Sequence, residues 1–408
     1  MPRLLCLGLL LFAPALHAGD RPDAAASAKA RRDFERAKPD ADLLKLDAAR
    51  VPLTKEDAAA VRDELWKRHV ARIKATRSEE FAKRLLQEGK LEMPFFVTEY
   101  GEKPKKGRSL WLSLHGGGGA PKAVNDKQWE NQKRLYKLSE GYYVAPRAPT
   151  NTWNLWHEGH IDRFFGRLIE DFVVLGDVDP DRVYVMGYSA GGDGIYQIGP
   201  RLADRWAGAA MMAGHPNGAS LLNLRNVAFA LQVGGNDSAY NRNKVGREYG
   251  AELERLHKAD PGGYPNFVKI HEGKGHWMDL QDAAALPWMA KFSRNPAPER
   301  VVWRQEGGHD RSYWLAVPPE EKTGGALVIV SRKGQTIEIE KAEKVKRLIL
   351  RLDDSFIDLD QPVRVIQEGK AIFEGRATRT PAALLKSLDG RGDPRLIFAA
   401  ELVVTVGK

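Results

Sequence analysis

Apolar and polar residues follow two different patterns along the chain, and the change between them falls near residue 296. Between residues 93 and 295, short apolar runs typical of strands alternate with amphipathic helical segments. The apolar runs cover 93–98, 109–114, 142–145, 182–186, 208–212, 227–233 and 267–271, and the helical segments cover 161–175, 196–206 and 244–257. This alternation predicts an α/β fold with a doubly wound, mostly parallel sheet that is covered by helices on both faces.

The residues before this domain predict an N-terminal helical segment over 19–92. A helical pattern starts after Thr54 and continues to Val70, and a second one surrounds Phe81 and Leu86. Their apolar positions recur at helical spacing, so we expect both helices to pack on the main domain.

The residues after this domain predict a small C-terminal β-rich domain over 296–408. Pro296-Ala297-Pro298 marks the boundary, and alternating β runs follow it. One of these runs is expected at 313–317, and one helix is expected near 380–388. The arrangement resembles a sandwich of two sheets.

Composition narrows the possible functions. The chain has 408 residues, of which 43% are hydrophobic and 29% charged, values that are ordinary for a globular protein. The formal net charge is +9, but the basic residues are dispersed among acidic ones and form no block with interleaved aromatics. We therefore expect no nucleic-acid partner.

The first 18 residues predict a signal peptide. Arg3 precedes a short apolar run, and small residues follow it up to Ala18, a pattern that is too short for a membrane span. Secretion or a periplasmic location is expected. The only cysteine, Cys6, falls inside this segment, so the mature chain is predicted to lack disulfides and thiol chemistry.

The stretch GYSAGG, residues 187–192, is the first candidate for chemistry. It follows the apolar run 182–186 and precedes a helical segment. Glycines two places before and after Ser189 fit a sharp strand-to-helix turn that exposes a nucleophilic hydroxyl. A plain glycine-rich turn is the alternative, so the interpretation depends on finding a base, an acid and an oxyanion site elsewhere.

A glycine-rich loop supplies candidate oxyanion donors. His115 and four glycines follow directly after the apolar run 109–114. Backbone N–H groups of Gly116 and Gly117 can face inward there without a Cβ in the way. A flexible loop or a phosphate-binding turn is the alternative, and the absence of a G-x-x-x-x-G-K-[ST] pattern disfavours the second.

An acid and a base follow in the order that a triad needs. Asp237 comes after the run 227–233, at the sheet edge that also holds the serine, although turn aspartates are common in such loops. His276 follows the run 267–271 in a glycine-flanked loop. His271 is a competitor, but it falls within the predicted strand. The chain order Ser189, Asp237, His276 favours catalysis.

Taken together, HGGGG, GYSAGG, GGNDSAY and GKGHW resemble the α/β-hydrolase family over residues 93–295. The resemblance is to secreted serine esterases, a group that includes feruloyl and acetylxylan esterases and polyhydroxybutyrate depolymerases, and to the catalytic domain of prolyl-oligopeptidase-type peptidases. It implies that Ser189 is the nucleophile, Asp237 the acid and His276 the base, and that Ala190 N–H joins the oxyanion hole. The predicted lack of disulfides departs from those secreted groups.

Three further residues are substrate-binding candidates. Trp156 and His157 lie in a loop after the run 142–145, where aromatic side chains are expected to wall the pocket. His215 lies at another strand end on the same edge. A zinc site around His157 and His160 is the alternative, but their three-residue spacing is not that of H-E-x-x-H, and no metal is expected.

Three functions follow from these residues. The first is a secreted hydrolase that cleaves carboxylic esters, either of small molecules or linked to polysaccharides, without any cofactor. The second is a serine peptidase of prolyl-oligopeptidase type, and the third is a non-catalytic protein that binds a polymer or an envelope partner. The N-terminal segment is too short for the propeller that usually gates such peptidases, which counts against the second function, and the complete triad disfavours the third; the oligomeric state is left open.

Overall fold

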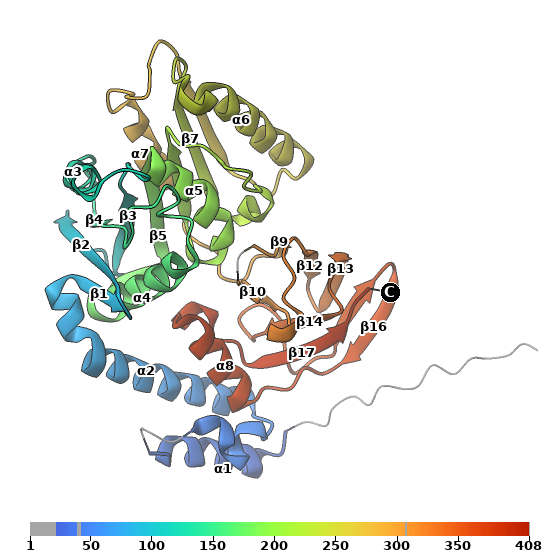
Figure 1. Cartoon of the computed structure of the whole chain (residues 1–408). Helices are drawn as coiled ribbons and strands as arrows, with labels where there is room; N and C mark the ends of the chain where they lie inside the picture. Colours follow the sequence, from blue (N-terminus) through green and yellow to red (C-terminus); the bar gives the residue numbers. More distant parts are fainter. Residues whose placement is uncertain (1–21, 39–41, 307, 408) are drawn as a thin grey trace, which may run out of the picture.

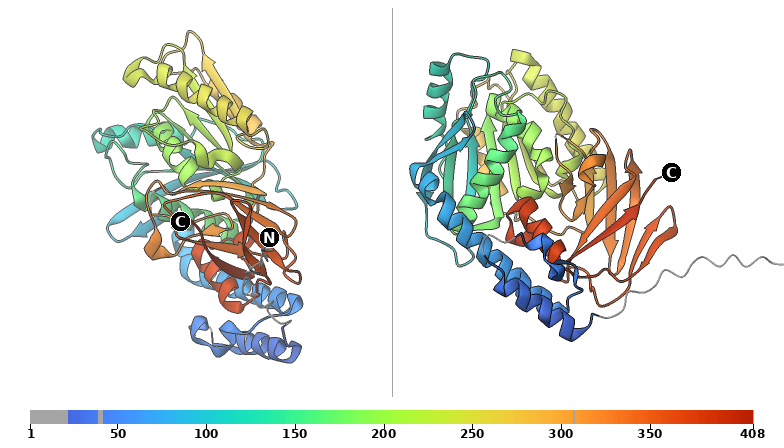
Figure 2. Two further views of the ribbon diagram at one scale, coloured as in Figure 1. Left: turned by 90° about the vertical axis from the view of Figure 1, so that its right-hand side faces the viewer. Right: turned by 60° about the horizontal axis from the view of Figure 1, so that its bottom comes forward.

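A computed structural model describes residues 22–38, 42–306 and 308–407 of the chain. These residues form N-terminal helices, a central sheet with flanking helices, and a C-terminal β-rich part (Figures 1 and 2). The predicted signal peptide, residues 1–18, lies outside the described residues. Within the described ranges, no helix combines the length and apolar character needed to cross a bilayer.

The central sheet has eight strands in the order β1-β2-β4-β3-β5-β6-β7-β8. The β1–β2 and β2–β4 pairs are antiparallel, and all other neighbours are parallel. The strands are β1 (Leu85–Glu88), β2 (Leu91–Tyr100), β3 (Arg108–Leu114), β4 (Gly141–Pro146), β5 (Val178–Tyr188), β6 (Gly208–Met212), β7 (Ala228–Gly234) and β8 (Asn266–His271). The predicted fold class, a doubly wound and mostly parallel sheet, is confirmed.

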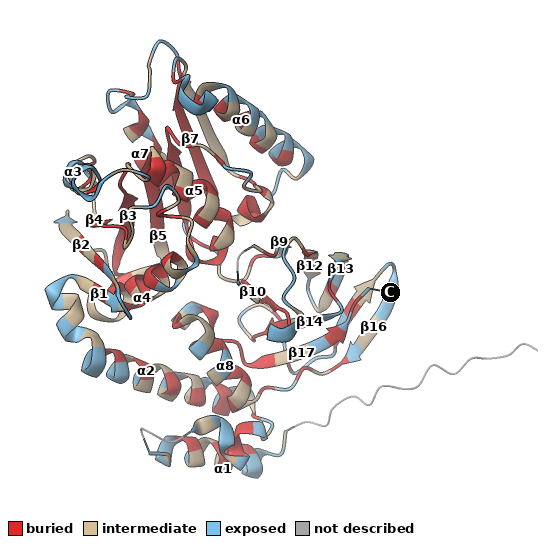
Figure 3. Cartoon of the chain, viewed as in Figure 1, coloured by how far each residue is buried: buried red, intermediate tan, exposed pale blue. Residues whose placement is uncertain are grey.

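Helices cover both faces of this sheet, and strand residues alternate between the two sides. On β5, Val183 and Val185 join a buried cluster with α4 and α5, whereas Tyr184 and Met186 join a second cluster with α7. The helices are α3 (Lys122–Gln132), α4 (Gly159–Leu175), α5 (Ala190–Arg201), α6 (Arg242–Ala259) and α7 (Ala285–Met289). The central strands are buried almost throughout, as expected for parallel strands with two covered faces (Figure 3).

The N-terminal segment contains α1 (Ala24–Arg36) and one long helix, α2 (Lys55–Lys83). The prediction of a separate second helix around Phe81 and Leu86 was wrong, because α2 continues through Phe81 and Leu86 lies in β1. Arg84 ends the helix in the left-handed conformation, and its φ of 55° turns the chain into β1. Leu86 then pairs with Met93 of β2 and is fully buried.

Helix α2 contacts both the sheet domain and the C-terminal part. It lies against α4 on one side and against α8 (Pro381–Arg391) on the other (Figures 1 and 2). The buried His69 of α2 lies 2.6 Å from the Glu170 carboxylate of α4. Arg62, earlier on α2, pairs with Asp353 of the C-terminal part. The expectation that the N-terminal helices pack on the main domain therefore describes only part of the contacts of α2.

The C-terminal part consists of two small sheets. One has the order β10-β11-β14-β17 and is antiparallel, and the other has the order β16-β15-β13-β12-β9 and contains one parallel pair, β13–β15. The strands are β9 (Arg300–Arg304), β10 (Arg311–Ser312), β11 (Leu315–Ala316), β12 (Leu327–Lys333), β13 (Thr336–Glu343), β14 (Arg347–Leu352), β15 (Val363–Gln367), β16 (Lys370–Gly375) and β17 (Ala400–Thr405).

Only part of the predicted strand 313–317 forms, because Tyr313 and Trp314 lie in a turn and Leu315–Ala316 is strand β11. Tyr313 has a φ of 52°, so the chain turns there between β10 and β11. Its side chain is buried and its hydroxyl donates to Ala203 O at 2.9 Å. The run is apolar because it lies between the C-terminal part and the sheet domain, which a strand pattern alone does not reveal.

A buried arginine joins the sheet domain to the C-terminal part. Arg294, whose side chain is 1% exposed, lies 2.8 Å from Asp181 of β5 and 2.7 Å from Asp393. It also donates to Asp204 O at 2.8 Å. Burial disfavours its charge, but the two carboxylates outweigh that effect and raise its pKa.

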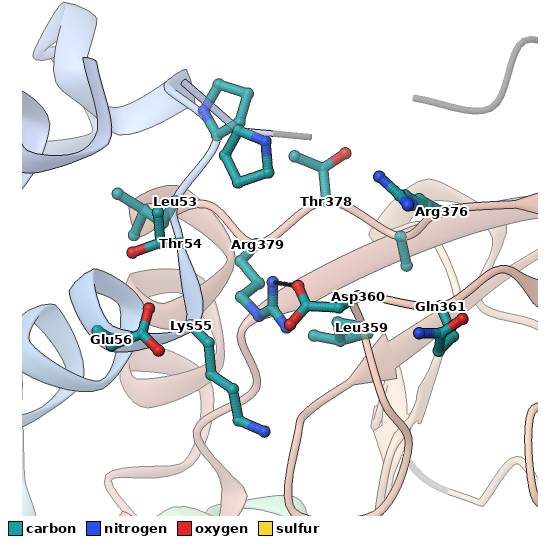
Figure 4. A pocket seen from close by; sticks show the side chains of 13 residues that line it. Leu53, Thr54, Lys55, Glu56, Leu359, Asp360, Gln361, Arg376, Thr378 and Arg379 are labelled. Carbon is teal, nitrogen blue, oxygen red and sulfur yellow. Dashed lines mark hydrogen bonds and ion pairs between the residues drawn. The ribbon is translucent and has the colours of Figure 1, made fainter. Parts of the chain in front are cut away.

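A second junction, between the N-terminal segment and the C-terminal part, encloses a hollow of 370 Å³ (Figure 4). Leu53 N donates to Arg379 O at 2.9 Å, which fixes the entry into α2. The Arg379 guanidinium pairs with Asp354 and Asp360, both at 2.7 Å. Its charge is thus matched within the protein.

Candidate functional site

Ser189 occupies a strained turn between β5 and α5. Its backbone has φ 58° and ψ −121°, a conformation that costs a non-glycine residue about 1–3 kcal/mol. Glycines make the turn possible, since a Cβ on Gly187 would collide with the Gly191 backbone and one on Gly191 with Leu114 O. The hydroxyl consequently projects at the carboxyl end of the sheet, which is the purpose of the turn predicted from GYSAGG.

Two loops bring His276 and Asp237 to this serine. His276, in the loop after β8, has its Nε2 atom 3.0 Å from Ser189 Oγ. Its Nδ1 atom lies 2.7 Å from Oδ2 of Asp237, which follows β7 and is 2% exposed. The structure thus brings together the three side chains that were predicted to act as nucleophile, base and acid. His271 is directed elsewhere and hydrogen-bonds Gln232 at 2.9 Å.

Tyr188, the residue before the serine, holds the histidine loop. Its hydroxyl donates to His276 O and accepts a hydrogen bond from Met278 N at 3.2 Å. Its ring also meets the His276 imidazole edge-on, with ring centroids 5.8 Å apart. The tyrosine at this x position of the G-x-S-x-G motif therefore contributes directly to the placement of His276.

The glycine loop after β3 lies beside Ser189 and offers free donors. A Cβ on Gly116 would stand 3.2 Å from Ser189 Cβ, so the loop and the serine are adjacent. Gly118 N donates to Asn125 Oδ1 at 2.9 Å, and Gly119 N donates to Asn151 O at 3.0 Å. Within the described chain, the N–H groups of Gly116 and Gly117 have no such partner. Those two are the donors predicted for the oxyanion hole.

Ala190 offers a third donor from the other side of the serine. It is the first residue of α5, where backbone N–H groups have no partner within the helix. The N-terminal end of a helix also carries a partial positive charge that favours a developing anion. The position fits the donor role predicted for Ala190.

His115 supports the glycine loop from beneath and stays neutral. Its Nδ1 lies 2.6 Å from Gly116 O, and its Nε2 accepts a hydrogen bond from Ala148 N at 3.1 Å. These partners place the proton on Nδ1. The ring is fully buried, and this burial lowers the pKa of His115 to about 3.

Replacing His115 by Gln is expected to flatten the dependence of stability on pH. The unfolded chain protonates His115 near pH 6.5, whereas the folded chain does so only near pH 3, so the unfolded state binds more protons between these values. Stability therefore falls as the pH falls through this window. From pH 6.5 to 4.5, the wild type should lose about 2 kcal/mol more than His115→Gln in urea unfolding. Equal losses in the two proteins would contradict the neutral, buried state of His115.

A cavity of 330 Å³ opens next to these residues. Gly117, Gly118 and Ala190 form one side, so the cavity adjoins the predicted oxyanion hole. Its other lining residues are Trp153, Asp193, His215, Asn217, Tyr240 and Arg242. Trp153 and Tyr240 are 62% and 77% exposed, which leaves two aromatic faces open at the rim of the cavity. Burial raises the pKa of Asp193. The backbone N–H of His215 donates a hydrogen bond to the Asp193 carboxylate and partly offsets this increase.

The three predicted substrate-binding residues are placed differently from one another. His215 lines the cavity, as expected. Trp156 is fully buried, and its indole N–H donates to His115 O at 2.9 Å, so it supports the glycine loop. His157 lies under Trp153, with ring centroids 5.5 Å apart, and burial lowers its pKa to about 4. Neither Trp156 nor His157 lines the cavity. The loop exposes Trp153 at the cavity and directs Trp156 and His157 toward the protein interior.

Sequence reasoning missed Trp153 and Arg242 as cavity residues. Trp153 carried a signal, because it belongs to the same aromatic loop as Trp156, but only the loop conformation decides which ring is exposed. Arg242 follows Asp237 by five residues and begins α6. Among the described residues, no group of three or more His, Cys, Asp or Glu side chains is arranged to hold a metal ion.

The path of the chain and the position of the serine define the fold. A strand-to-helix turn with a strained serine follows the fifth strand, and a glycine loop follows the third. This is the α/β-hydrolase fold. No protein-family model matches the sequence, and no curated protein matches it.

Solved structures that resemble this chain include esterases and other serine hydrolases. A thermostable esterase is 17% identical, with a TM-score of 0.41 over 52% of this chain and 62% of that one. A ferulic acid esterase is 18% identical, with a TM-score of 0.36 over 51% of this chain and 96% of that one. The Bacillus cereus carboxylesterase is 14% identical, with a TM-score of 0.35 over 54% and 98%.

Proposed function

We propose that this protein is an exported serine hydrolase that cleaves carboxylic esters through Ser189, His276 and Asp237. The continuous hydrogen-bonded line from Ser189 Oγ through the imidazole to the Asp237 carboxylate carries the proposal, with steps of 3.0 Å and 2.7 Å. The position of Ser189, at the strained turn and beside N–H donors that have no partner in the described chain, further supports the proposal. Export rests on the signal-peptide pattern of residues 1–18.

The reaction would proceed through an acyl-enzyme. His276 Nε2 takes the proton of Ser189 as Oγ attacks the ester carbonyl carbon, and the carbonyl oxygen becomes an oxyanion. Nε2 then gives this proton to the leaving alcohol as the C–O bond breaks. Water repeats the cycle on the acyl-enzyme and releases the acid, which regenerates Ser189.

Asp237 would stabilise the cationic imidazole that forms during each half of the reaction. Its carboxylate accepts the Nδ1 proton and so fixes the tautomer whose Nε2 can accept a proton. The backbone N–H groups of Gly116, Gly117 and Ala190 would stabilise the oxyanion. Such donors are effective because they are already oriented before charge develops, and one of them contributes about 3–4 kcal/mol to transition-state stabilisation.

Covalent labelling would test the nucleophile without knowledge of the natural ester. A fluorophosphonate reagent should form one adduct per chain, and peptide mass spectrometry should place it on Ser189. A panel of acetyl, feruloyl and hydroxybutyrate esters and of peptide anilides would then define the reaction. Turnover of anilides but not of esters would replace the esterase proposal by the peptidase alternative, and an absence of both labelling and turnover would favour the binding protein.

A further inference from the structure

Arg242 is a buried cation at the active-site cavity that lacks hydrogen-bond partners. It is 8% exposed, begins α6 and lines the 330 Å³ cavity together with Gly117 and Ala190. Its Nε atom is buried without a partner. Throughout the described residues, no hydrogen bond reaches any nitrogen of this guanidinium. Only Nε is cut off from solvent without a partner, which is costly, and the two Nη nitrogens are not buried, so a molecule in the cavity has access to them.

The charged neighbours of Arg242 do not supply this partner. Asp237 Oδ1 lies 3.8 Å from Nη1, too far for a hydrogen bond, and Oδ2 of the same carboxylate is used by His276. Asp193 lines the same cavity, but its Oδ1 accepts the His215 N–H at 2.6 Å, and no ion pair within 4.0 Å joins it to Arg242 in the described chain. The Tyr240 ring lies against the guanidinium, with its centroid 4.8 Å from Cζ.

We propose that Arg242 binds a carboxylate carried by the substrate, so that this enzyme acts on anionic esters. A carboxylate presents two oxygen atoms at the spacing of the guanidinium nitrogens, which makes it a well-matched partner. Trp153 and Tyr240, exposed at the rim of the cavity, would cover the apolar part of the same molecule. The inference rests on the proposed ester hydrolysis, because it assigns the substrate class of that site.

Two substrate pairs test this specificity, one for each side of the ester bond. For the alcohol side, 4-carboxyphenyl acetate is compared with the neutral 4-carbamoylphenyl acetate. For the acyl side, 4-nitrophenyl monoadipate is compared with its neutral methyl ester. The measured quantity is the ratio of kcat/KM for the charged over the neutral member, and comparing this ratio between protein variants cancels the intrinsic reactivity of each ester.

In Arg242→Gln, the charged-to-neutral ratio should fall about tenfold or more for at least one pair, because a charge-assisted hydrogen bond is lost. Arg242→Lys should recover part of the ratio. Arg247→Gln removes an arginine of the same helix that pairs with Glu272 at the surface, and it should leave the ratio unchanged. An equal loss on charged and neutral esters in Arg242→Gln would show that Arg242 only positions Asp237, and it would overturn the proposal.

A binding measurement covers the case in which Arg242→Gln does not fold. Ser189→Ala retains Arg242, and calorimetry with this protein should show that the charged member of at least one pair binds about tenfold more tightly than its neutral counterpart. Equal affinities for the two members of each pair would overturn the carboxylate site. Failure of the esterase proposal gives a different result, namely neutral-ester turnover that is the same in the wild type and in Ser189→Ala.

Discussion

Ser189→Ala is expected to lower kcat/KM for a short activated aryl ester at pH 7–8 by about 10³-fold or more. The methyl side chain cannot form the acyl-enzyme, so only the oxyanion donors and binding would remain to accelerate the reaction. The strained backbone at φ 58° is unfavourable for serine and alanine alike, so the folded structure should persist. Initial rates at several substrate concentrations, with circular dichroism of both proteins, provide the measurement.

Ser238→Ala is the matched control for this experiment. Ser238 is an exposed serine next to Asp237, and its hydroxyl has no role in the proposed reaction. The control should retain wild-type kcat/KM within about twofold, since surface substitutions away from special features have small effects. If Ser189→Ala keeps more than a tenth of the wild-type rate, Ser189 is not the nucleophile, and the whole assignment of the site fails.

Arg294→Met is expected to lower the free energy of unfolding by about 3–5 kcal/mol. The substitution removes the cation that lies between Asp181 and Asp393 and leaves Asp393 buried among fewer positive charges. Arg205 remains 3.5 Å from Asp393 but makes a weaker contact. Urea unfolding followed by tryptophan fluorescence measures the loss, provided that both parts of the chain unfold in one transition.

Arg395→Met serves as the control for Arg294→Met. Arg395 also pairs with Asp181, at 2.8 Å, but its side chain is 56% exposed, so its loss should cost less than about 1 kcal/mol. Adding Asp393→Asn to Arg294→Met should restore part of the stability, because the unpaired buried charge is then removed. A change below 1 kcal/mol in Arg294→Met would mean that water reaches this junction and that the pair is not buried in solution.

The proximity of Ser189, Asp237 and His276 could be predicted because their positions depend on strand ends, which the sequence marks well. Each of Ser189, Asp237 and His276 follows an apolar run of strand type, and parallel strands bring such ends to one edge. The same logic identified Gly116 and Gly117. Sequence motifs were therefore sufficient to predict which residues lie together wherever those residues follow neighbouring parallel strands.

The cavity could not be predicted in the same way. Trp153 and Trp156 belong to one loop, and both are compatible with a pocket wall or with the core. Which of the two tryptophans is buried depends on whether its indole N–H has an acceptor in the core. His115 O is that acceptor for Trp156. Arg242 could not be predicted either, because a basic residue at the start of a helix is normally exposed to solvent. Only the structure shows that Arg242 is buried at the cavity.

The contacts of α2 have a consequence for the order in which the molecule can be completed. This helix is synthesised long before one of its packing partners, α8 (Pro381–Arg391). The long separation between these segments raises the contact order and slows the last step of folding. A chain that is still growing, or one truncated before α8, must leave an apolar face of α2 uncovered. Packing of the sheet domain is therefore complete only when α8 is present, and chains that lack α8 should associate with one another instead of accumulating as a free sheet domain.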